Sequence, residues 1–259
     1  MEKDVKKAVR ESYTRIAEQG TNCCCGPSSS CCGDTDTVKE ISRGIGYSDD
    51  ELAAVPDGAN LGLGCGNPVA LASLQEGEIV LDLGSGAGFD CFLAANKVGG
   101  KGRVIGVDMT PEMVARAREN AIKGDYTNIE FRLGEIESLP VADALVDAVI
   151  SNCVINLSPD KQRVFKEIFR VLKPGGRLMV SDIVLLKPLP DAIRNSVEAY
   201  VSCIAGAALK DEYLEAIRAA GFKNIEVLGE SIVPMEDIPD DSRANSVISA
   251  RISAVKSNL

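Results

Sequence analysis

The sequence predicts an α/β fold with a mostly parallel, seven-stranded sheet, helices on both of its faces, an antiparallel C-terminal edge strand and an additional helical segment. Short apolar runs alternate with helical patterns from Ile79 to Val184, which is typical of a parallel sheet with right-handed crossovers. Glycines directly follow the first apolar run, as in a tight turn between a strand and a helix. The length of 259 residues, 45% of them hydrophobic, suits one such domain with an added segment.

The chain begins with a predicted helix and a cysteine-rich arm, which together occupy residues 1–44. Val5, Val9 and Ile16 are spaced for one helix face, and Gly20 ends the helix. The next stretch combines Cys with Gly, Pro and Ser, a composition that favours a loop. Its cysteines are Cys23, Cys24, Cys25, Cys31 and Cys32.

Residues 45–185 contain the predicted core of the sheet. The expected helices begin at Asp90, Thr110 and Ser158. A Thr-Pro or Ser-Pro pair opens the last two, because Thr and Ser cap helices and Pro suits the first helical position. The fifth strand is nearly all apolar, as expected for a strand buried on both faces. The predicted strands are Ile79–Leu83, Arg103–Asp108, Ile129–Leu133, Val146–Asn152 and Arg177–Val184.

The alternation of strands and helices stops after Val184. We expect a helical segment over residues 186–222, with helices at about 191–208 and 211–220. Residues 223–259 contain two further strands, at 224–228 and 246–255. No helix is evident between them, which predicts an antiparallel pair that completes the sheet at its edge.

Composition excludes several classes of function. The net charge of −10 argues against nucleic acid or an anionic membrane surface as a partner. The absence of His excludes a Ser-His-Asp triad, a Cys-His dyad and His-ligated zinc. We see no secretory signal after Met1 and no apolar run as long as a membrane span. The nine cysteines are therefore expected to be free thiols in a reducing cytoplasm.

A glycine-rich loop, Asp82-Leu83-Gly84-Ser85-Gly86-Ala87-Gly88, connects the first strand to the first helix of the sheet. Glycine allows a sharp turn and close approach of a ligand, and the N–H groups at the helix start attract a carboxylate or phosphate. Asp108 ends the second strand, where an acid accepts hydrogen bonds from ribose hydroxyls. The spacing differs from the G-x-G-x-x-G dinucleotide fingerprint, although an NAD-binding or empty Rossmann-like domain stays an alternative.

With an acid two residues before its first glycine, this loop resembles motif I of the class I S-adenosylmethionine-dependent methyltransferases. The resemblance implies a Rossmann-like core and S-adenosylmethionine as the cofactor. It implies that Asp82 faces the methionine amino group, that Asp108 binds the ribose, and that Gly134-Glu135-Ile136 contacts adenine. The residues expected to bind the cofactor are Asp82, Gly84, Ser85, Gly86, Gly88, Asp108, Met109, Glu135, Ile136 and Asn152.

Three cysteines lie where ligand-facing loops are expected. Ligands of open α/β sheets bind beyond the carboxyl ends of the strands. Cys153 follows the fourth strand, and Cys65 and Cys203 lie in segments that can fold over the same mouth. A free cysteine is often only a small buried hydrophobe, which is our interpretation of Cys91. Asp182 is either a member of the site or a buried strand-end carboxylate satisfied by the backbone.

The sequences around these cysteines are distinctive: Gly62-Leu63-Gly64-Cys65-Gly66, Ser151-Asn152-Cys153-Val154-Ile155-Asn156-Leu157, and Cys203 with Gly206-Ala207. They closely resemble the arsenite methyltransferases. The resemblance implies that Cys65, Cys153 and Cys203 bind trivalent arsenic as the catalytic thiols, and that an N-terminal cysteine takes part in redox steps. Soft trivalent arsenic selects thiolates, and its lone pair needs no general base. A thiol reductant, thioredoxin or glutathione, would reopen the resulting disulfide.

The sequence therefore predicts a cytoplasmic enzyme that methylates thiolate-bound arsenite for arsenic detoxification. One alternative is methylation of another small molecule, such as a quinone or sterol, which would give no reason for three separated thiols. The other is a protein that sequesters metalloids without turnover. The intact glycine loop with Asp82 and Asp108 argues against sequestration, because that function needs no sulfonium cofactor.

Overall fold

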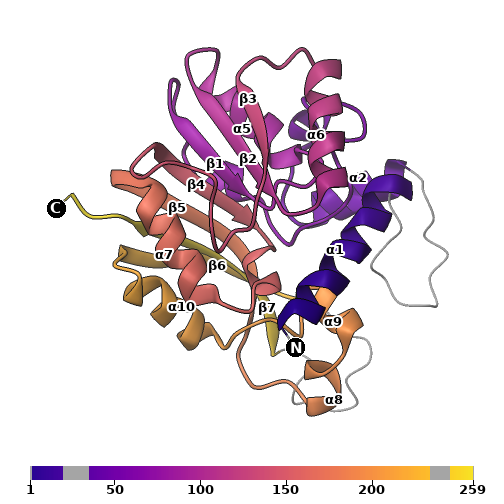
Figure 1. Cartoon of the computed structure of the whole chain (residues 1–259), viewed down its shortest axis with the longest axis vertical. Coiled ribbons are helices and arrows are strands. Elements are labelled where there is room, and N and C mark those ends of the chain that lie inside the picture. Colours follow the sequence, from indigo (N-terminus) through magenta and orange to yellow (C-terminus); the bar gives the residue numbers. More distant parts are fainter. Residues whose placement is uncertain (1, 20–34, 234–245, 259) are drawn as a thin grey trace.

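A seven-stranded sheet forms the centre of the computed structural model, which describes residues 2–19, 35–233 and 246–258 (Figure 1). The strands lie in the order β3-β2-β1-β4-β5-β7-β6. The first five strands are all parallel to their neighbours among one another, whereas β7 is antiparallel to both β5 and β6. The predicted fold class is thereby confirmed. The strands are β1 (Ile79–Leu83), β2 (Arg103–Asp108), β3 (Ile129–Leu133), β4 (Val146–Asn152), β5 (Leu172–Leu185), β6 (Lys223–Ile232) and β7 (Val247–Val255).

The C-terminal strand β7 lies between β5 and β6, whereas we expected the antiparallel C-terminal strand at the edge of the sheet. β7 pairs with β5 on one side and with β6 on the other. Most residues of β7 are buried, while β6 exposes charged side chains such as Lys223 and Glu230. Charged side chains on an outermost strand discourage pairing with other chains, so the more polar strand takes the edge.

Helices cover both faces of the sheet. α5 (Phe89–Val98) and α6 (Pro111–Lys123) pack on one face, and α7 (Lys161–Val171) and α10 (Lys210–Ala219) pack on the other. Val80 of β1 packs in the core on the side of α5 and α6, and the adjacent Leu81 packs in the core on the side of α7 and α10. Successive side chains of a strand point to opposite faces of the sheet. The parallel strands are thus buried from both sides, and their carboxyl ends meet at one common edge.

The helix α1 (Glu2–Gln19) lies beside this edge and contacts both α6 and α9 (Figure 1). It buries Val9 and Ile16, as the predicted apolar face requires. None of the helices in the described ranges has the length and apolar character that a membrane span needs. The cysteines of the N-terminal arm lie outside the described residues; they are Cys23, Cys24, Cys25, Cys31 and Cys32. The short helices before β1 are α2 (Thr35–Gly44), α3 (Asp49–Ala53) and α4 (Pro68–Leu71).

The segment after β5 is broken, and the prediction of one helix over residues 191–208 is wrong. α8 (Asp191–Arg194) is followed by Ser196, whose hydroxyl accepts a hydrogen bond from the N–H of Ala199 at 3.2 Å and starts α9 (Val197–Val201). Cys203 then has a φ of 63°, a left-handed conformation that a right-handed helix does not contain. A short 3-10 turn, η1 (Ile155–Leu157), follows β4.

Candidate active site

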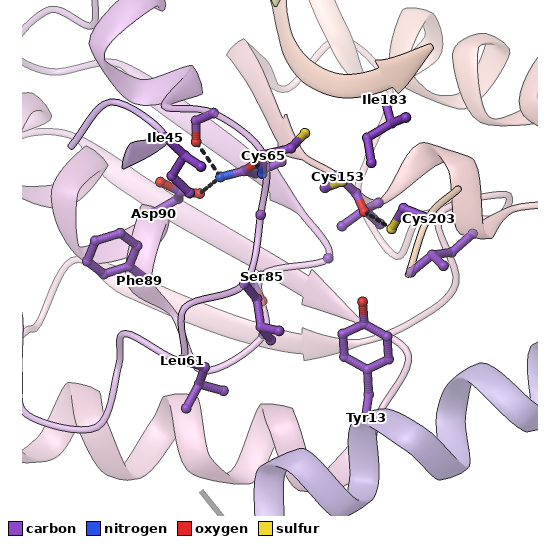
Figure 2. A pocket seen from close by; sticks show the side chains of 18 of the residues that line it. Tyr13, Ile45, Leu61, Cys65, Ser85, Phe89, Asp90, Cys153, Ile183 and Cys203 are labelled. Atoms are coloured by element: carbon purple, nitrogen blue, oxygen red, sulfur yellow. Dashed lines mark hydrogen bonds between the residues drawn. The ribbon is translucent and has the colours of Figure 1, made fainter. Parts of the chain in front are cut away.

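A cavity of about 680 Å³ opens at the carboxyl ends of β1, β2 and β4. Its walls come from α1, the stretch before α4, the loop after β1, the ends of β2 and β4, and the segment after α9. Figure 2 shows Cys65, Cys153 and Cys203 along one border of this pocket, and Tyr13 of α1 reaching toward it from another side. The cavity therefore joins the glycine loop to the cysteines.

The loop after β1 has an open backbone on the cavity side. Gly84, Gly86 and Gly88 have φ values of 65°, 50° and 96°, in the region that favours glycine. The N–H groups of Gly84 and Ser85 donate to the carbonyl of Val107 at 2.8 and 3.1 Å. In the described part of the chain, no atom beyond the adjacent residues lies within 4 Å of where a Cβ of Gly86 would stand. The loop is thus fixed to β2 and leaves space for a ligand beside it.

Two polar side chains of this region fit the expected cofactor. Asp108, at the end of β2, accepts hydrogen bonds from the N–H groups of Gly86 at 2.9 Å and Thr110 at 2.8 Å. The Oγ of Ser85 is buried and has no hydrogen-bond partner among the described residues. Buried hydroxyls are normally paired, so a ligand that supplies the partner fits this position. The open backbone, Asp108 and Ser85 together match the polar groups of S-adenosylmethionine.

Two buried carboxylates lie near the loop. Asp82 accepts a hydrogen bond from Cys91 Sγ at 3.2 Å, and Asp90 accepts one from the hydroxyl of Tyr47 at 2.6 Å. Burial raises the pKa of Asp82 well above its usual range, and the negative charge of Asp90 adds to this. Burial raises the pKa of Asp90 to about 6. A ligand cation beside the two acids would favour their ionised forms, so this part of the cavity suits an ammonium group.

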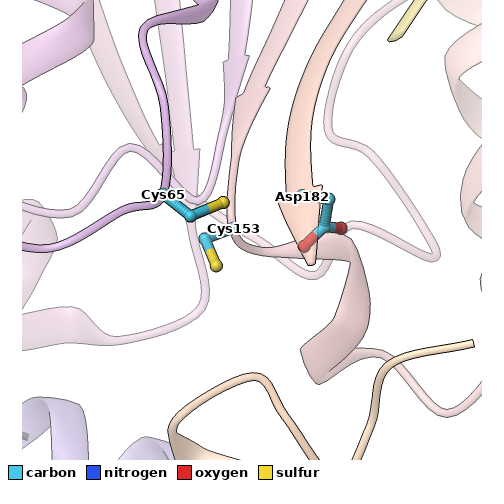
Figure 3. Close-up of side chains that lie close together, drawn as sticks. All are labelled: Cys65, Cys153 and Asp182. Atoms are coloured by element: carbon cyan, nitrogen blue, oxygen red, sulfur yellow. The ribbon is translucent and has the colours of Figure 1, made fainter. Parts of the chain in front are cut away.

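The three predicted cysteines converge from remote stretches of the chain. The sulfurs of Cys65 and Cys153 and a carboxylate oxygen of Asp182 all lie within 4.8 Å of one another (Figure 3). Cys203 Sγ donates a hydrogen bond to the carbonyl oxygen of Cys153 at 2.8 Å. All three cysteines are free thiols. The fold therefore places the sulfurs of Cys65 and Cys153 in one group with Asp182 and brings the sulfur of Cys203 to the backbone of Cys153, just outside that group.

Two of these cysteines have a left-handed backbone. Cys153 has a φ of 59° and Cys203 a φ of 63°. This conformation costs about 1–3 kcal/mol for a residue other than glycine, and such strain concentrates at functional sites. The N–H of Cys153 donates to the carbonyl of Ser181 at 2.8 Å, which ties the strained residue to β5.

The environment favours the neutral forms of Cys65 and Cys153. The hydrogen bond with Cys153, and then burial, raise the pKa of Cys65 well above its usual value. The hydrogen bond with Cys203 is the largest cause that raises the pKa of Cys153, and burial raises it further. At neutral pH Cys65 and Cys153 therefore present S–H groups, whose protons a ligand must displace.

Asp182 of β5 belongs to this cluster and is fully buried. Its Oδ1 accepts hydrogen bonds from Asn156 Nδ2 at 2.8 Å and from the N–H of Ile183 at 3.0 Å, and its Oδ2 accepts one from the hydroxyl of Tyr213 at 3.0 Å. Burial raises the pKa of Asp182 to about 7, while the hydrogen bond from Tyr213 and the charge of Lys161 act against that rise. The carboxylate is thus satisfied partly by the backbone and also adjoins the thiols.

Asn152 connects the cofactor side of the cavity to the cysteines. Its Oδ1 accepts the N–H of Cys65 at 2.9 Å, and its Nδ2 donates to the carbonyl of Gly66 at 2.8 Å. The same Nδ2 contacts the hydroxyl of Tyr47 at 2.9 Å and Asp90 Oδ2 at 3.2 Å. One amide therefore links the buried acid to the loop that carries Cys65.

Comparison with known proteins places this site in a family. Residues 74–221 match the family model described as a methyltransferase domain. An arsenite methyltransferase of Halobacterium salinarum is 52% identical over 230 residues, which are 86% of this chain and 59% of that protein. The crystal structure of the arsenic(III) S-adenosylmethionine methyltransferase of Chlamydomonas reinhardtii matches with a TM-score of 0.67 and 34% identity, covering 85% of this chain and 74% of that one. The chain belongs to the arsenite methyltransferase family.

A further member of the arsenite methyltransferase family, from Aquipseudomonas alcaligenes, is 40% identical over 181 residues. The match covers 67% of this chain and 52% of that protein. The chain thus spans between 52% and 59% of the length of these two curated relatives. The family that the glycine loop and the cysteine sequences indicated is confirmed.

The cavity of this arsenite methyltransferase family member brings together most of the residues that the sequence analysis expected. Glu135 is not among the lining residues, and its carboxylate pairs with Lys6 at 2.9 Å and Arg10 at 3.6 Å. Gly88 lies at the start of α5, where a Cβ would stand 2.8 Å from ring atoms of Phe92 and Phe131. The expected residues that do line the cavity are Cys65, Asp82, Gly84, Ser85, Gly86, Asp108, Met109, Ile136, Asn152, Cys153 and Cys203.

Sequence reasoning missed other residues of the site. Lys6 and Tyr13 reach the cavity from α1, and Glu137 lines it while pairing with Lys6 at 2.8 Å. No local motif marks these positions, because they depend on how α1 docks. Asp90 was also missed, although its place in the first turn after the glycine loop is a signal that was available. Cys91 is buried in the core, as the sequence analysis expected.

Proposed function

We propose that this chain transfers methyl groups from S-adenosylmethionine to arsenite bound by Cys65, Cys153 and Cys203. The observation that carries the proposal is the convergence of these thiols beside a cavity that also contains the glycine loop and Asp108. Trivalent arsenic is soft and prefers sulfur to imidazole or carboxylate ligands. A chain without His is therefore equipped for this substrate.

Neutral thiols suit the capture of arsenite. Arsenite at neutral pH is As(OH)₃, and each S–H group replaces one hydroxide with release of one water. Three thiols thus give As(SR)₃ and three waters, without a net change in charge. The raised pKa values of Cys65 and Cys153 favour this condensation over binding of a free cation by thiolates.

The residues around the glycine loop would hold the cofactor. When bound, S-adenosylmethionine supplies a methyl group activated by a sulfonium centre. We assign the methionine ammonium group to Asp82 with Asp90 beside it, and the ribose hydroxyls to Asp108. The ligand would supply a hydrogen-bond partner for the buried hydroxyl of Ser85. The same proposal includes Gly84, Gly86, Met109, Ile136 and Asn152, which line the cavity, and leaves out Gly88 and Glu135, which do not line it.

The chain's main contribution to methyl transfer is positioning. The arsenic lone pair carries no proton, so none of these residues has to act as a general base. Cys65 and Cys203 approach from opposite sides of Cys153 (Figure 2), and three sulfur ligands leave the lone pair as the open position of arsenic. Holding that pair in line with the methyl group gains the advantage of a near-attack arrangement.

A reduction step follows the transfer. Methylation leaves arsenic formally pentavalent, and two thiols return it to the trivalent state by giving two electrons and becoming a disulfide. The N-terminal cysteines Cys23, Cys24, Cys25, Cys31 and Cys32 are candidates for this step, as in the family resemblance. A thioredoxin- or glutathione-type thiol would reopen the disulfide by exchange, and our proposal includes a reducing cytoplasm as the location of the protein.

The decisive experiment combines purified protein, arsenite, methyl-labelled S-adenosylmethionine and a thiol reductant. We expect label in methylated arsenicals, with one S-adenosylhomocysteine formed for each methyl transferred. Tight arsenite binding without any methylated arsenic would instead favour sequestration. Transfer of label to an added quinone, with no arsenical product, would favour a small organic acceptor.

A further inference from the structure

We propose that the Asp182 carboxylate stabilises the positive charge that develops on arsenic during methyl transfer. The inference rests on the proposed function and deepens it, because it gives a role to a carboxylate that neither arsenic binding nor cofactor binding requires. It starts from position: a carboxylate oxygen of Asp182 lies within 4.8 Å of the sulfurs of Cys65 and Cys153.

Methyl transfer moves a positive charge from the cofactor to the substrate. The lone pair of arsenic forms the new As–C bond, while the S–C bond of the sulfonium breaks and its electron pair stays on sulfur. The cofactor becomes neutral at this sulfur, and (RS)₃As becomes the cation (RS)₃As–CH₃⁺. No proton, oxidant or reductant is needed for this step. An anion near arsenic therefore stabilises the transition state more than the neutral bound substrate.

The fold places Asp82 and Asp182 at opposite ends of the route along which the positive charge moves from the cofactor to arsenic. Asp82 lies on β1 at the cofactor side, and Asp182 lies on β5 at the thiol cluster, with β4 between the two strands. The charge thus moves away from Asp82 and toward Asp182. The electrostatic attraction between the Asp182 carboxylate and arsenic therefore increases as the reaction proceeds.

The surroundings of Asp182 hold it ready for this role. Asn156, Tyr213 and the N–H of Ile183 fix both carboxylate oxygens. Hydrogen-bond donors that are already oriented need no rearrangement during the reaction. A buried carboxylate is costly compared with an apolar side chain of similar size, so its presence within a core strand fits a functional use.

Replacement by the isosteric amide tests the proposal. Above pH 7, where Asp182 with its pKa of about 7 is ionised, we expect Asp182→Asn to slow single-turnover methyl transfer by roughly 10- to 100-fold. The Kd values for arsenite and S-adenosylmethionine should change by less than about threefold, because bound arsenite is neutral. Asp147→Asn is the matched control. It removes a half-buried carboxylate at the opposite end of β4, where Asp147 accepts hydrogen bonds from Ile79 N–H and Lys173, and it should leave the rate unchanged.

A second readout does not depend on catalysis. Cadmium(II) bound by the Cys65 and Cys153 thiolates is a neutral Cd(SR)₂ centre that takes up a carboxylate oxygen as a further ligand, and an oxygen of Asp182 lies within 4.8 Å of both sulfurs. Arsenite bound by three thiols needs no such ligand. In a background with serine at Cys23, Cys24, Cys25, Cys31 and Cys32, Asp182→Asn should weaken cadmium binding at least about tenfold and leave arsenite binding unchanged. If Asp182→Asn does not fold, Asp182→Ser enters the same comparison.

Tyr213→Phe distinguishes the effect of the Asp182 charge from the effect of its hydrogen bonds, because this substitution removes one hydrogen bond to Asp182 and keeps the carboxylate. We expect its rate to stay within about threefold of the natural chain. The proposal is overturned if Asp182→Asn transfers methyl at the natural rate, if arsenite and cadmium binding fall equally, or if Tyr213→Phe is as slow as Asp182→Asn. The proposed function would be refuted if the unsubstituted protein made no methylarsenical. Even then, a loss of cadmium binding but not of arsenite binding in Asp182→Asn would identify Asp182 as an anion within reach of the thiols.

Discussion

The side-chain oxygen of Asn152 accepts the backbone N–H of Cys65 at 2.9 Å, across 87 positions of sequence. Asn152 ends β4 and is followed directly by Cys153. This hydrogen bond therefore fixes the loop that carries one cysteine to the strand that carries another. The distance between the two sulfurs depends on a residue that contributes no sulfur itself.

Crowding Asn152 should disturb this relationship. A Cβ on Gly64, where φ is +110°, would lie 2.7–2.8 Å from the amide atoms of Asn152. We expect Gly64→Ala to weaken arsenite binding at least about tenfold, or ~1.4 kcal/mol, measured by calorimetry. Gly77→Ala is the control, because Gly77 has a similar φ of +88° and open space at its Cβ position. Equal affinities in the two variants would show that the contact with Asn152 does not position Cys65.

Removing the central sulfur should separate transfer from cofactor binding. Cys153→Ser keeps the size of the side chain but replaces a soft ligand by a hard one. We expect methyl transfer to arsenite to fall at least roughly 100-fold, because arsenic is no longer held in line with the methyl group. The Kd for S-adenosylmethionine should be unchanged. Normal turnover of this variant would exclude the assigned arsenic site.

The assignment of Asp108 predicts a loss of cofactor affinity. Asp108→Ala removes both a charged acceptor for the ribose and the carboxylate that fixes Gly86 and Thr110. We expect cofactor binding to weaken by about 1.5–3 kcal/mol, measured by calorimetry without arsenite. Asp211→Ala, at an exposed position in the first turn of α10, should bind as the natural chain does. Unchanged affinity in Asp108→Ala would move the ribose contact elsewhere.

The buried acids predict a pH-dependent stability. The pKa of Asp90 is about 6 in the folded state, compared with an ordinary value of 3.8. The folded chain thus binds this proton more tightly than the unfolded chain. The resulting stability is fully present below about pH 4 and is lost as the pH rises through about 6, by about 3 kcal/mol for a shift of roughly two units.

Urea unfolding at constant ionic strength measures this effect. The free energy of unfolding should fall between about pH 4 and 7, and Asp90→Asn should make that fall smaller. Asp82, whose pKa burial also raises, contributes in the same direction, whereas the hydrogen bonds from Tyr47 and Asn152 oppose the shift of Asp90. Asp50→Asn, at an exposed position, should keep the natural slope. Identical slopes in Asp90→Asn and the natural chain would contradict the raised pKa.

Local patterns in the sequence predicted the parallel part of the fold well. The apolar run at Ile79–Leu83, the glycines after it and the Thr110-Pro111 helix start are each determined by neighbouring residues, and the structure has them in place. The helical pattern over residues 191–208 failed for two reasons: the Ser196 cap is a local signal that the composition hides, and Cys203 is held by a distant contact with the carbonyl of Cys153. The capping of α9 by Ser196 and the left-handed Cys203 interrupt a stretch whose composition is helical. β7 lies between β5 and β6 because its residues are mostly buried, whereas β6 has the exposed, charged side chains that suit an edge strand.

Strand periodicity, turn geometry and the family's characteristic motifs are properties of short stretches. The sheet, the glycine loop and the candidate cysteines could therefore be predicted from the sequence alone. Three relationships came from the folded structure: Cys65 and Cys153 lie beside Asp182, Asn152 accepts the N–H of Cys65, and α1 supplies a wall of the cavity. These relationships join residues many positions apart. Their distances are set by how helices and loops pack on the carboxyl edge of the sheet, which no local pattern encodes.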